Sequence, residues 1–210
     1  MPPAPLRGRR RGSTLRPMAP EADRLPAGPH RWPDFLALDE DDLRELVDGH
    51  FLEIEVPNEF HEWVVTWLVT SLTNWAHPRG AGFAFASGYK VRIRKDRGVM
   101  PDVQFYRGRR GRLPLRGLHR GAPDLAVEVV SPSSRRGDRV VKLGWYASIG
   151  TPEYWIVDPM TRTLDRFLLS SGGTPEPTGH YLHHDLFAPE SLPELVIDLS
   201  QRWPADDDDD

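Results

Sequence analysis

The sequence predicts a single α/β domain in which helices cover a mixed β-sheet. The chain has 210 residues, which is enough for one domain of ordinary size. A strongly apolar helical pattern occupies residues 59–76, and a second helical pattern at 134–150 has strand patterns on both sides of it. Strands that alternate with helices in this way are typical of a sheet covered by helices.

The first elements of the domain can be placed by their turn and cap residues. Residues 33–46 open with a short amphipathic helical pattern, and two apolar runs around Asp48-Gly49 predict a β-hairpin with a two-residue turn. Asn58 is a favourable N-cap for the long helix, which is expected to end at residues 77–80. The expected apolar face of that helix consists of side chains three and four positions apart: Phe60, Trp63, Val64, Trp67, Leu68, Leu72 and Trp75.

The remaining elements follow as short strand patterns around the second helix. Three of them lie between the helices, at residues 82–87, 89–95 and 100–106. An arginine-rich loop at 107–121 leads to a long apolar strand within residues 122–134. After the second helix, we expect strands at 153–158 and 163–169, a hairpin-like region at 180–186 and a last strand at 195–199.

Both ends of the chain are expected to be tails. Residues 1–30 are rich in Pro, Arg, Gly and Ala without periodicity, which predicts a disordered tail, with a nucleic-acid-binding arm as the alternative. Residues 204–210 carry an acidic run whose like charges favour a solvated tail. The folded domain is therefore expected over residues 31–203.

The composition excludes several classes of protein. The absence of cysteine excludes a disulfide scaffold and a thiolate metal site, and it fits a reducing compartment. The apolar runs are too short for a membrane span of about 20 residues, and no secretory signal is recognisable at the N-terminus. We therefore expect a cytoplasmic protein without a membrane segment. The net charge of −4 excludes a protein that is basic all over, but it allows a local basic surface.

Asp102 and Glu128 are the first candidates for a functional site. Glu128 stands in the middle of an apolar strand, where a lone charge is costly. Because side chains alternate along a strand, Asp102 shares a face with Gln104, and the two carboxylates converge if their strands are neighbours. A Mg²⁺ ion between them would offset their charge. The alternatives are an ion pair of Glu128 with an arginine and a simple turn at Asp102.

These residues resemble the PD-(D/E)XK nuclease superfamily, which carries Pro-Asp on one strand and an acidic residue on the next. More specifically, the chain is similar to the Uma-two family of restriction-endonuclease-like proteins. The similarity extends over roughly residues 33–200. The matching segments are LVDGHFLEI, the helix with His61, VMPDVQFY, the run from Gly121 to Pro159, and LPELVIDL.

The resemblance implies a restriction-endonuclease-like fold with a metal centre. The expected fold is a mixed central sheet with an αβββαβ core, to which an N-terminal hairpin and C-terminal strands are added. The implied metal ligands are Asp102, Glu128 and the backbone carbonyl of Val129. The implied ion is Mg²⁺, with Mn²⁺ as a substitute, because oxygen ligands suit hard cations.

The resemblance also indicates where the catalytic lysine lies. The superfamily pattern places lysine two residues after the Glu, but here that position is Val130. In this family the lysine is moved to the following helix, where Lys142 is the candidate. Lys142 would orient the attacking water or stabilise the developing oxyanion. The alternative is a surface ion pair with Asp138, which lies four positions earlier on the same helix.

Four residues are accessory candidates for the same site. His61, near the start of the first long helix, matches a family position, and an ordinary structural role at the helix end is the alternative. Glu59 flanks His61 on the same helix turn. Gln104 shares a face with Asp102, and Asp138 is placed to share a helix face with Lys142.

Taken together, the sequence predicts a metal-dependent DNA endonuclease. The loop at 107–121 has six arginines, of which Arg109, Arg110 and Arg112 are expected to contact DNA phosphates; a solvated loop is the alternative. A homodimer is expected because a cut in both strands needs two sites. We expect its contact at the aromatic segments 145–150 and 153–158. The alternative functions are an inactive binding module of the same fold and a metal phosphoesterase for small substrates.

Overall fold

The computed structural model describes residues 28–39, 41–54, 56–108, 121–130, 136–170, 175–201 and 203, without the side chains of 136–140. The expectations for residues 1–27, for Arg109, Arg110 and Arg112, and for the acidic run at 204–210 lie outside the described residues.

The helices and strands have the following bounds along the chain. They are α1 (Trp32–Leu36), β1 (Arg44–Val47), β2 (His50–Glu53), α2 (Glu59–Arg79), β3 (Gly82–Ala86), β4 (Val91–Arg94), β5 (Arg97–Val99), β6 (Val103–Arg107), β7 (Leu125–Val129), α3 (Arg136–Ser148), β8 (Glu153–Asp158), β9 (Thr163–Leu168), β10 (Glu176–Tyr181), β11 (Leu186–Phe187), β12 (Ile197–Asp198) and the short 3₁₀ helix η3 (Leu199–Gln201).

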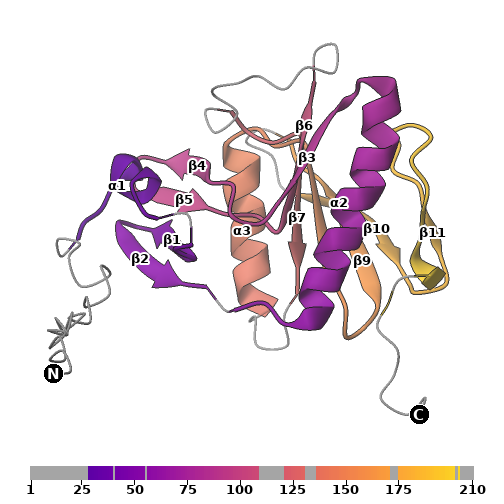
Figure 1. The fold of residues 1–210 in the computed structure, drawn as a ribbon, viewed down its shortest axis with the longest axis horizontal. Coiled ribbons are helices and arrows are strands. Elements are labelled where there is room, and N and C mark those ends of the chain that lie inside the picture. The colour runs from indigo at the N-terminus through magenta and orange to yellow at the C-terminus, as the bar shows by residue number, and fades with distance from the viewer. Residues whose placement is uncertain are drawn as a thin grey trace, which may run out of the picture.

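The described strands form a mixed central sheet and a separate N-terminal sheet (Figure 1). The central sheet has the order β10-β9-β8-β7-β6-β3, and β7 and β8 are its parallel pair. The N-terminal sheet has the order β2-β1-β5-β4 and is antiparallel. Strands β11 and β12 pair with each other. The succession α2, β3, β6, β7, α3 and β8 is an αβββαβ core, which confirms the restriction-endonuclease-like fold class.

The central sheet lies between two helices, with α2 on one face and α3 on the other (Figure 1). Alternate residues of β7 face the two helices. Leu125, Val127 and Val129 pack into the core that includes α2, whereas Ala126 and Val130 pack into the core that includes α3. Because side chains alternate along a strand, Glu128 faces α3.

The N-terminal hairpin forms at the predicted dipeptide. Asp48 and Gly49 both have positive φ angles, 52° and 82°, as a two-residue hairpin turn requires. A Cβ atom on Gly49 would also lie only 2.9 Å from the side chain of Pro29. The hairpin prediction is therefore confirmed, and glycine is needed at its second turn position for conformation and for space.

Helix α2 begins and ends as expected, but its buried face differs from the prediction. Asn58 Oδ1 accepts a hydrogen bond from the His61 amide at 2.9 Å, and Gly80 ends the helix with a φ of 57°. Trp63 was expected in the buried face but is 54% exposed. Apolar residues occur nearly all round this helix, so spacing alone does not identify the face that packs on the sheet. The buried residues are His61, Val64, Val65, Leu68, Leu72, Trp75 and Ala76.

The strands between β3 and β7 also differ in part from the prediction. Strand β5, at Arg97–Val99, was not expected, and β6 begins at Val103 rather than at Met100. Strand β5 pairs with β1, with Leu46 opposite Gly98. This pairing joins segments that are far apart in the sequence, and a local residue pattern does not reveal it. As a result, the segment from Met100 to Asp102 connects the two sheets.

The expected dimer contact is wrong, because its central residues form the core of one chain. Tyr146, Tyr154 and Trp155 are fully buried. Strand β8 lies between β7 and β9 in the middle of the central sheet. The two segments are apolar because they fill the interior. In addition, none of the described helices combines the length and the apolar character that crossing a membrane requires.

Candidate functional site

Strand pairing places Asp102 and Glu128 at the same level of the central sheet. In the antiparallel pair of β6 and β7, Val103 lies opposite Val127 and Gln104 lies opposite Ala126. The next position in this register puts Asp102 opposite Glu128. Both residues line one pocket of about 690 Å³. The convergence expected from the alternation of strand side chains is therefore present.

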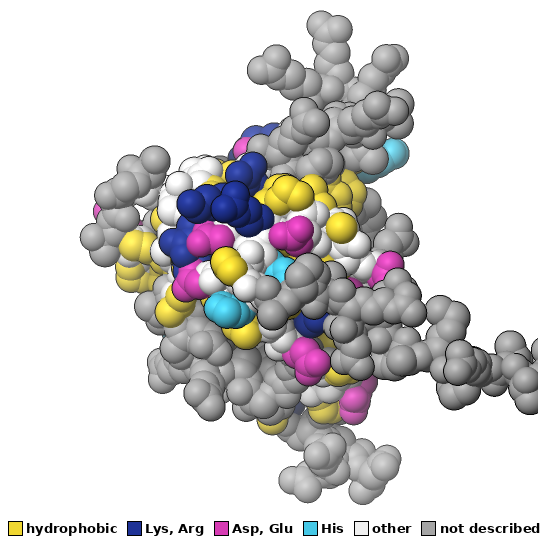
Figure 2. All heavy atoms as spheres, turned by 90° about the vertical axis from the view of Figure 1, so that its left-hand side faces the viewer, with side chains coloured by type: hydrophobic (Ala, Val, Ile, Leu, Met, Phe, Trp, Pro, Cys, Tyr) yellow, Lys and Arg dark blue, Asp and Glu magenta, His cyan; other side chains and the backbone are white. Residues whose placement is uncertain are grey.

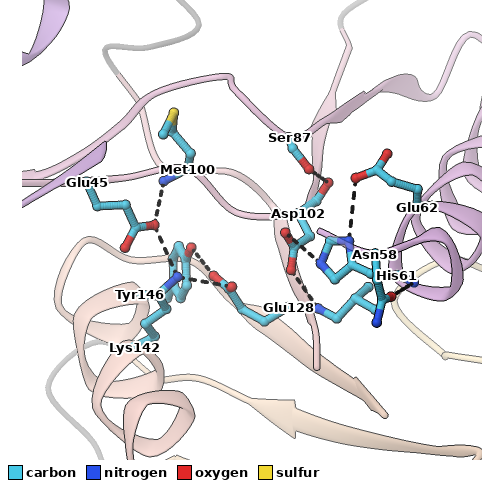
Figure 3. A network of polar contacts seen from close by, with 11 residues as sticks. Glu45, Asn58, His61, Glu62, Ser87, Met100, Asp102, Glu128, Lys142 and Tyr146 are labelled. Carbon is cyan, nitrogen blue, oxygen red and sulfur yellow. Dashed lines mark hydrogen bonds and ion pairs between the residues drawn. The ribbon is translucent and has the colours of Figure 1, made fainter. Parts of the chain in front are cut away.

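Both carboxylate oxygens of Asp102 contact other residues of the protein (Figure 3). Oδ2 accepts a hydrogen bond from the Val129 amide at 2.8 Å, which ties the start of β6 to β7. Oδ1 lies 3.3 Å from Nε2 of His61, on the first turn of α2. His61 is thus brought into the candidate site by the N-terminus of the helix that Asn58 caps.

Glu128 is held by two side chains that lie one turn apart on α3. Its Oε1 accepts a hydrogen bond from the Tyr146 hydroxyl at 2.9 Å, and its Oε2 lies 3.1 Å from Lys142 Nζ. Figure 3 shows both side chains pointing from α3 toward Glu128. The lysine that the family resemblance indicated is therefore within contact distance of the candidate metal ligand.

Glu45 is a third carboxylate of the cluster, and the sequence analysis missed it. It lies on β1, where its Oε1 accepts hydrogen bonds from Lys142 Nζ at 3.1 Å and from the Met100 amide at 3.0 Å. One sequence signal could have identified it. Glu45 lies two positions from both Leu43 and Val47, so it is a single acid on an otherwise apolar strand face, as Glu128 is in β7.

The carboxylates and Lys142 shift each other's protonation equilibria. The pKa of Glu128 is raised to about 7, chiefly by burial. The charge of Lys142 lowers this pKa, whereas the charges of Asp102 and Glu45 raise it further. Burial alone would lower the pKa of Lys142, but Glu128, Glu45 and Asp102 outweigh it and hold that pKa above its usual range. Lys142 therefore remains protonated at neutral pH.

His61 and Tyr146 are shifted by the same carboxylates. Burial works to lower the pKa of His61, but the hydrogen bond to Asp102 and its charge raise it overall. Burial and the nearby charge of Glu128 raise the pKa of Tyr146 well above its usual value. Tyr146 therefore serves as a neutral hydrogen-bond donor to Glu128 and does not ionise.

Two accessory candidates are not brought into the cluster. Glu59 is exposed on the first turn of α2 and is not among the residues that line the pocket. Gln104 is fully buried, where its amide donates to the Tyr89 carbonyl and accepts from the Tyr106 hydroxyl, both at 2.8 Å. Gln104 therefore supports β6 from within the core.

The remaining predicted residues are placed only in part. Asp138 lies in α3, but its side chain is outside the described residues. The alternative for Lys142, an ion pair with Asp138, lies outside the described side chains. The Lys142 ammonium group contacts two pocket carboxylates, those of Glu45 and Glu128. Val129 lines the pocket, and its amide is the donor to Asp102.

The donor set of the pocket fits a hard cation whose shell is completed by water. Within the described residues, no three His, Asp or Glu side chains already converge as metal ligands. Asp102 and Glu128 nevertheless retain lone pairs beyond the hydrogen bonds they accept. Mg²⁺ is commonly held by one or two carboxylates with several waters and substrate phosphates, so two carboxylates in an open pocket are sufficient.

Comparison with known proteins finds solved structures of similar architecture. A protein from Anabaena variabilis ATCC 29413, described as a putative nuclease belonging to DUF820, has a TM-score of 0.66 and 19% sequence identity. The similarity covers 82% of this chain and 96% of that one. No curated protein sequence matches the chain.

The comparison with family models is more specific. Residues 32–200 match the model of the family named Uma2, which is described as “Putative restriction endonuclease”. The match spans nearly all of the described domain, from α1 to η3. The chain therefore belongs to the Uma2 family.

Proposed function

We propose that the protein is a metal-dependent DNA endonuclease that hydrolyses phosphodiester bonds. The observation that carries this proposal is the convergence of Asp102, Glu128 and Lys142 in one pocket. These residues come from the position just before β6, from β7 and from α3, so the fold brings them together from three separate segments. Membership of a family described as restriction endonucleases supports the same reaction class.

The proposed metal ligands are Asp102, Glu128 and the backbone carbonyl of Val129. Mg²⁺, or Mn²⁺ in its place, would neutralise phosphate charge and lower the pKa of a bound water. Hydrogen bonds hold both carboxylates in place, since Asp102 accepts from the Val129 amide and Glu128 from the Tyr146 hydroxyl. Fixed carboxylates require little rearrangement when charge develops during the reaction.

Lys142 is assigned as an electrostatic donor and not as the general base. A general base must be free to accept a proton, whereas the carboxylates around Lys142 raise its pKa. Its ammonium group is therefore available to stabilise negative charge on the phosphate oxygens in the transition state. His61 acts through Asp102, whose carboxylate it contacts at 3.3 Å.

A phosphoesterase for small substrates is the second candidate function. The described lining of the pocket contains two cations, Arg97 and Lys142, and a larger number of acids. A surface that binds long nucleic acids through phosphate contacts is usually richer in cations than this. The same carboxylate and lysine chemistry could serve a small phosphodiester, which needs no extended basic groove.

A cleavage assay distinguishes these possibilities. Plasmid DNA, oligonucleotides and bis(p-nitrophenyl) phosphate are incubated with Mg²⁺, with Mn²⁺ or with EDTA. We expect DNA cleavage that requires the metal, that is lost in Glu128→Gln and Asp102→Asn, and that is retained in the matched control Glu59→Gln. Cleavage of the small diester without cleavage of DNA would favour the second candidate. Binding of DNA without any cleavage would indicate an inactive module.

A further inference from the structure

The candidate site continues into an apolar wall that the proposed reaction does not use. Leu43 and Leu52 from the N-terminal hairpin region and Val141 from α3 line the same pocket as Glu128. Their side chains are 40%, 50% and 50% exposed. Single exposed apolar residues are ordinary, but these three line one pocket together and form an apolar wall within it. Figure 2 shows hydrophobic side chains exposed on the face of the N-terminal sheet, beside gathered Lys and Arg side chains.

The reactive groups lie deep in this pocket. The side chains of Asp102, Glu128 and Lys142 are 17%, 11% and 19% exposed. A phosphate must therefore enter the pocket before it can approach them. In a duplex the backbone is stiff and the bases are stacked inside. A single strand bends freely, and its unstacked bases can lie on apolar and aromatic side chains.

Only two cations, Arg97 and Lys142, are present in the described pocket lining, so the apolar wall would supply much of the contact with a nucleotide chain. Arg97 stacks over Trp145 at 4.2 Å from the ring centroid and forms an ion pair with Asp48 of the hairpin turn. Lys142 is held between Glu45 and Glu128. Both cations are fixed by their neighbours, and the apolar side chains line the same cavity. Its volume of about 690 Å³ is within the usual range of ligand pockets.

We propose that the site acts on unpaired DNA, with the base next to the scissile phosphate lying against Leu52 and Val141. This inference rests on the proposed nuclease function and specifies its substrate class. The flat apolar face of an unpaired base can pack against these apolar side chains. The phosphate attached to that base would then reach Asp102 and Glu128. Base stacking of this kind tolerates any sequence, because every base has an apolar face.

The test compares DNA forms on the full chain, with Ca²⁺ in place of Mg²⁺ to suppress cleavage. The probes are a labelled single-stranded 20-mer, the blunt duplex of the same sequence, and that duplex with a mismatched bubble. We expect the single strand to bind at least tenfold more tightly than the duplex. With Mg²⁺ or Mn²⁺, we expect cuts within the bubble and not in the paired arms.

Two variants test the apolar wall itself. Leu52→Gln combined with Val141→Gln should weaken single-strand binding by about tenfold, because two half-exposed apolar side chains no longer bury their surface against the base. Both positions are half exposed, so the fold should tolerate the change. The matched control is Leu186→Gln with Val196→Gln, which changes two exposed apolar residues outside the pocket lining. Mn²⁺ binding, measured by calorimetry, should be unchanged in both double variants.

The outcomes separate this inference from the function on which it rests. Duplex bound and cut as well as the single strand would overturn the inference and leave the nuclease proposal standing. An unchanged affinity of the Leu52 and Val141 variant would also overturn it. If the unmodified protein neither binds nor cuts any DNA form, the nuclease function itself fails, and the inference fails with it.

Discussion

Glu128 is buried with a tyrosine hydroxyl on one carboxylate oxygen and a lysine ammonium group on the other. Two further carboxylates, from Asp102 and Glu45, lie close enough to raise its pKa. The single positive charge of Lys142 thus lies near three carboxylates, those of Glu128, Asp102 and Glu45. A cluster with this excess of negative charge is costly to bury, and a divalent cation or a proton relieves the cost. We therefore expect the same residue to affect stability in the absence of metal and metal binding in its presence.

The first prediction concerns the pH dependence of stability without metal. Glu128 has a pKa of about 7 in the folded protein and 4.5 as a free side chain, so the folded state binds the additional proton between these values. The free energy of unfolding therefore falls as pH rises from about 4.5 to 7. The loss is up to about 3 kcal/mol, because one pKa unit corresponds to about 1.4 kcal/mol.

Urea unfolding in EDTA at pH 5 and pH 7.5 measures this effect. Glu128→Gln removes the titrating group and should remove this part of the pH dependence. Titrations of groups that do not interact with Glu128 contribute equally to both proteins and cancel in the difference. A stability difference between the two proteins that is the same at both pH values would show that Glu128 is ionised throughout.

The second prediction concerns Glu45 as a positioning residue for Lys142. Glu45→Gln keeps an acceptor for the Met100 amide but removes one of the charges that hold the Lys142 ammonium. We expect kcat to fall by about 10- to 100-fold, as for other residues that orient a reactive group. KM should change little. The decline of activity on the alkaline side of the pH profile should shift to a lower pH, because the pKa of Lys142 falls.

Kinetics against pH for the unmodified protein and for Glu45→Gln provide the measurement. Glu176→Gln, an exposed change on β10, is the control and should behave as the unmodified protein. A reduced kcat with an unshifted alkaline limb would mean that Glu45 only supports the fold.

At the scale of elements, the site depends on where α2 begins and how the hairpin meets α3. Asn58 fixes the first turn of α2, and His61 in that turn reaches Asp102. Glu45 of β1 reaches Lys142 of α3, so the N-terminal sheet is tied to the central sheet through the candidate site. Changes at these junctions should therefore affect both stability and the site.

The third prediction concerns the cap of α2. Asn58→Ala removes the acceptor of the His61 amide and should lower the free energy of unfolding by about 1 kcal/mol. Asn58→Asp retains the acceptor and should stay close to the unmodified protein. Urea unfolding of both variants is the measurement. An equal loss in both, or none in Asn58→Ala, would contradict a capping role.

Elements that depend on local residue chemistry could be predicted from the sequence. Asp48-Gly49 specified the hairpin because few other dipeptides adopt two positive φ angles. The pairing of Leu46 with Gly98 could not be predicted in this way, since it is a contact between distant segments. The contacts of Glu45 with Lys142 and Met100 also join distant segments, although its place as a single acid on an apolar strand face was a local signal.

At the scale of the whole molecule, the resemblance predicted the fold and the pairing of Asp102 with Glu128. It did so because antiparallel register and side-chain alternation leave little freedom once β6 and β7 are neighbours. It could not predict which aromatic residues are buried. Tyr146 and Trp155 resembled interface residues, yet they fill the core on the two faces of the sheet.

The fourth prediction is that the protein forms a homodimer. Two-fold pairing is the commonest form of soluble homo-oligomer, and two sites would let one assembly cut both strands of an unpaired region. The contact should lie away from β8, which is enclosed in the central sheet. Light scattering at working concentrations, with and without DNA, is the measurement. A monomer under all of these conditions would remove the prediction.

The central claim is that Asp102 and Glu128 bind one divalent cation, and titration calorimetry with Mn²⁺ at pH 8 tests it most directly. This pH is above the pKa of about 7 of Glu128, so the carboxylate is ionised before metal is added. We predict one Mn²⁺ bound per chain, with binding lost in Asp102→Asn and in Glu128→Gln and retained in Glu59→Gln. Binding that is equally strong in all four proteins, or absent from the unmodified protein, would contradict the account.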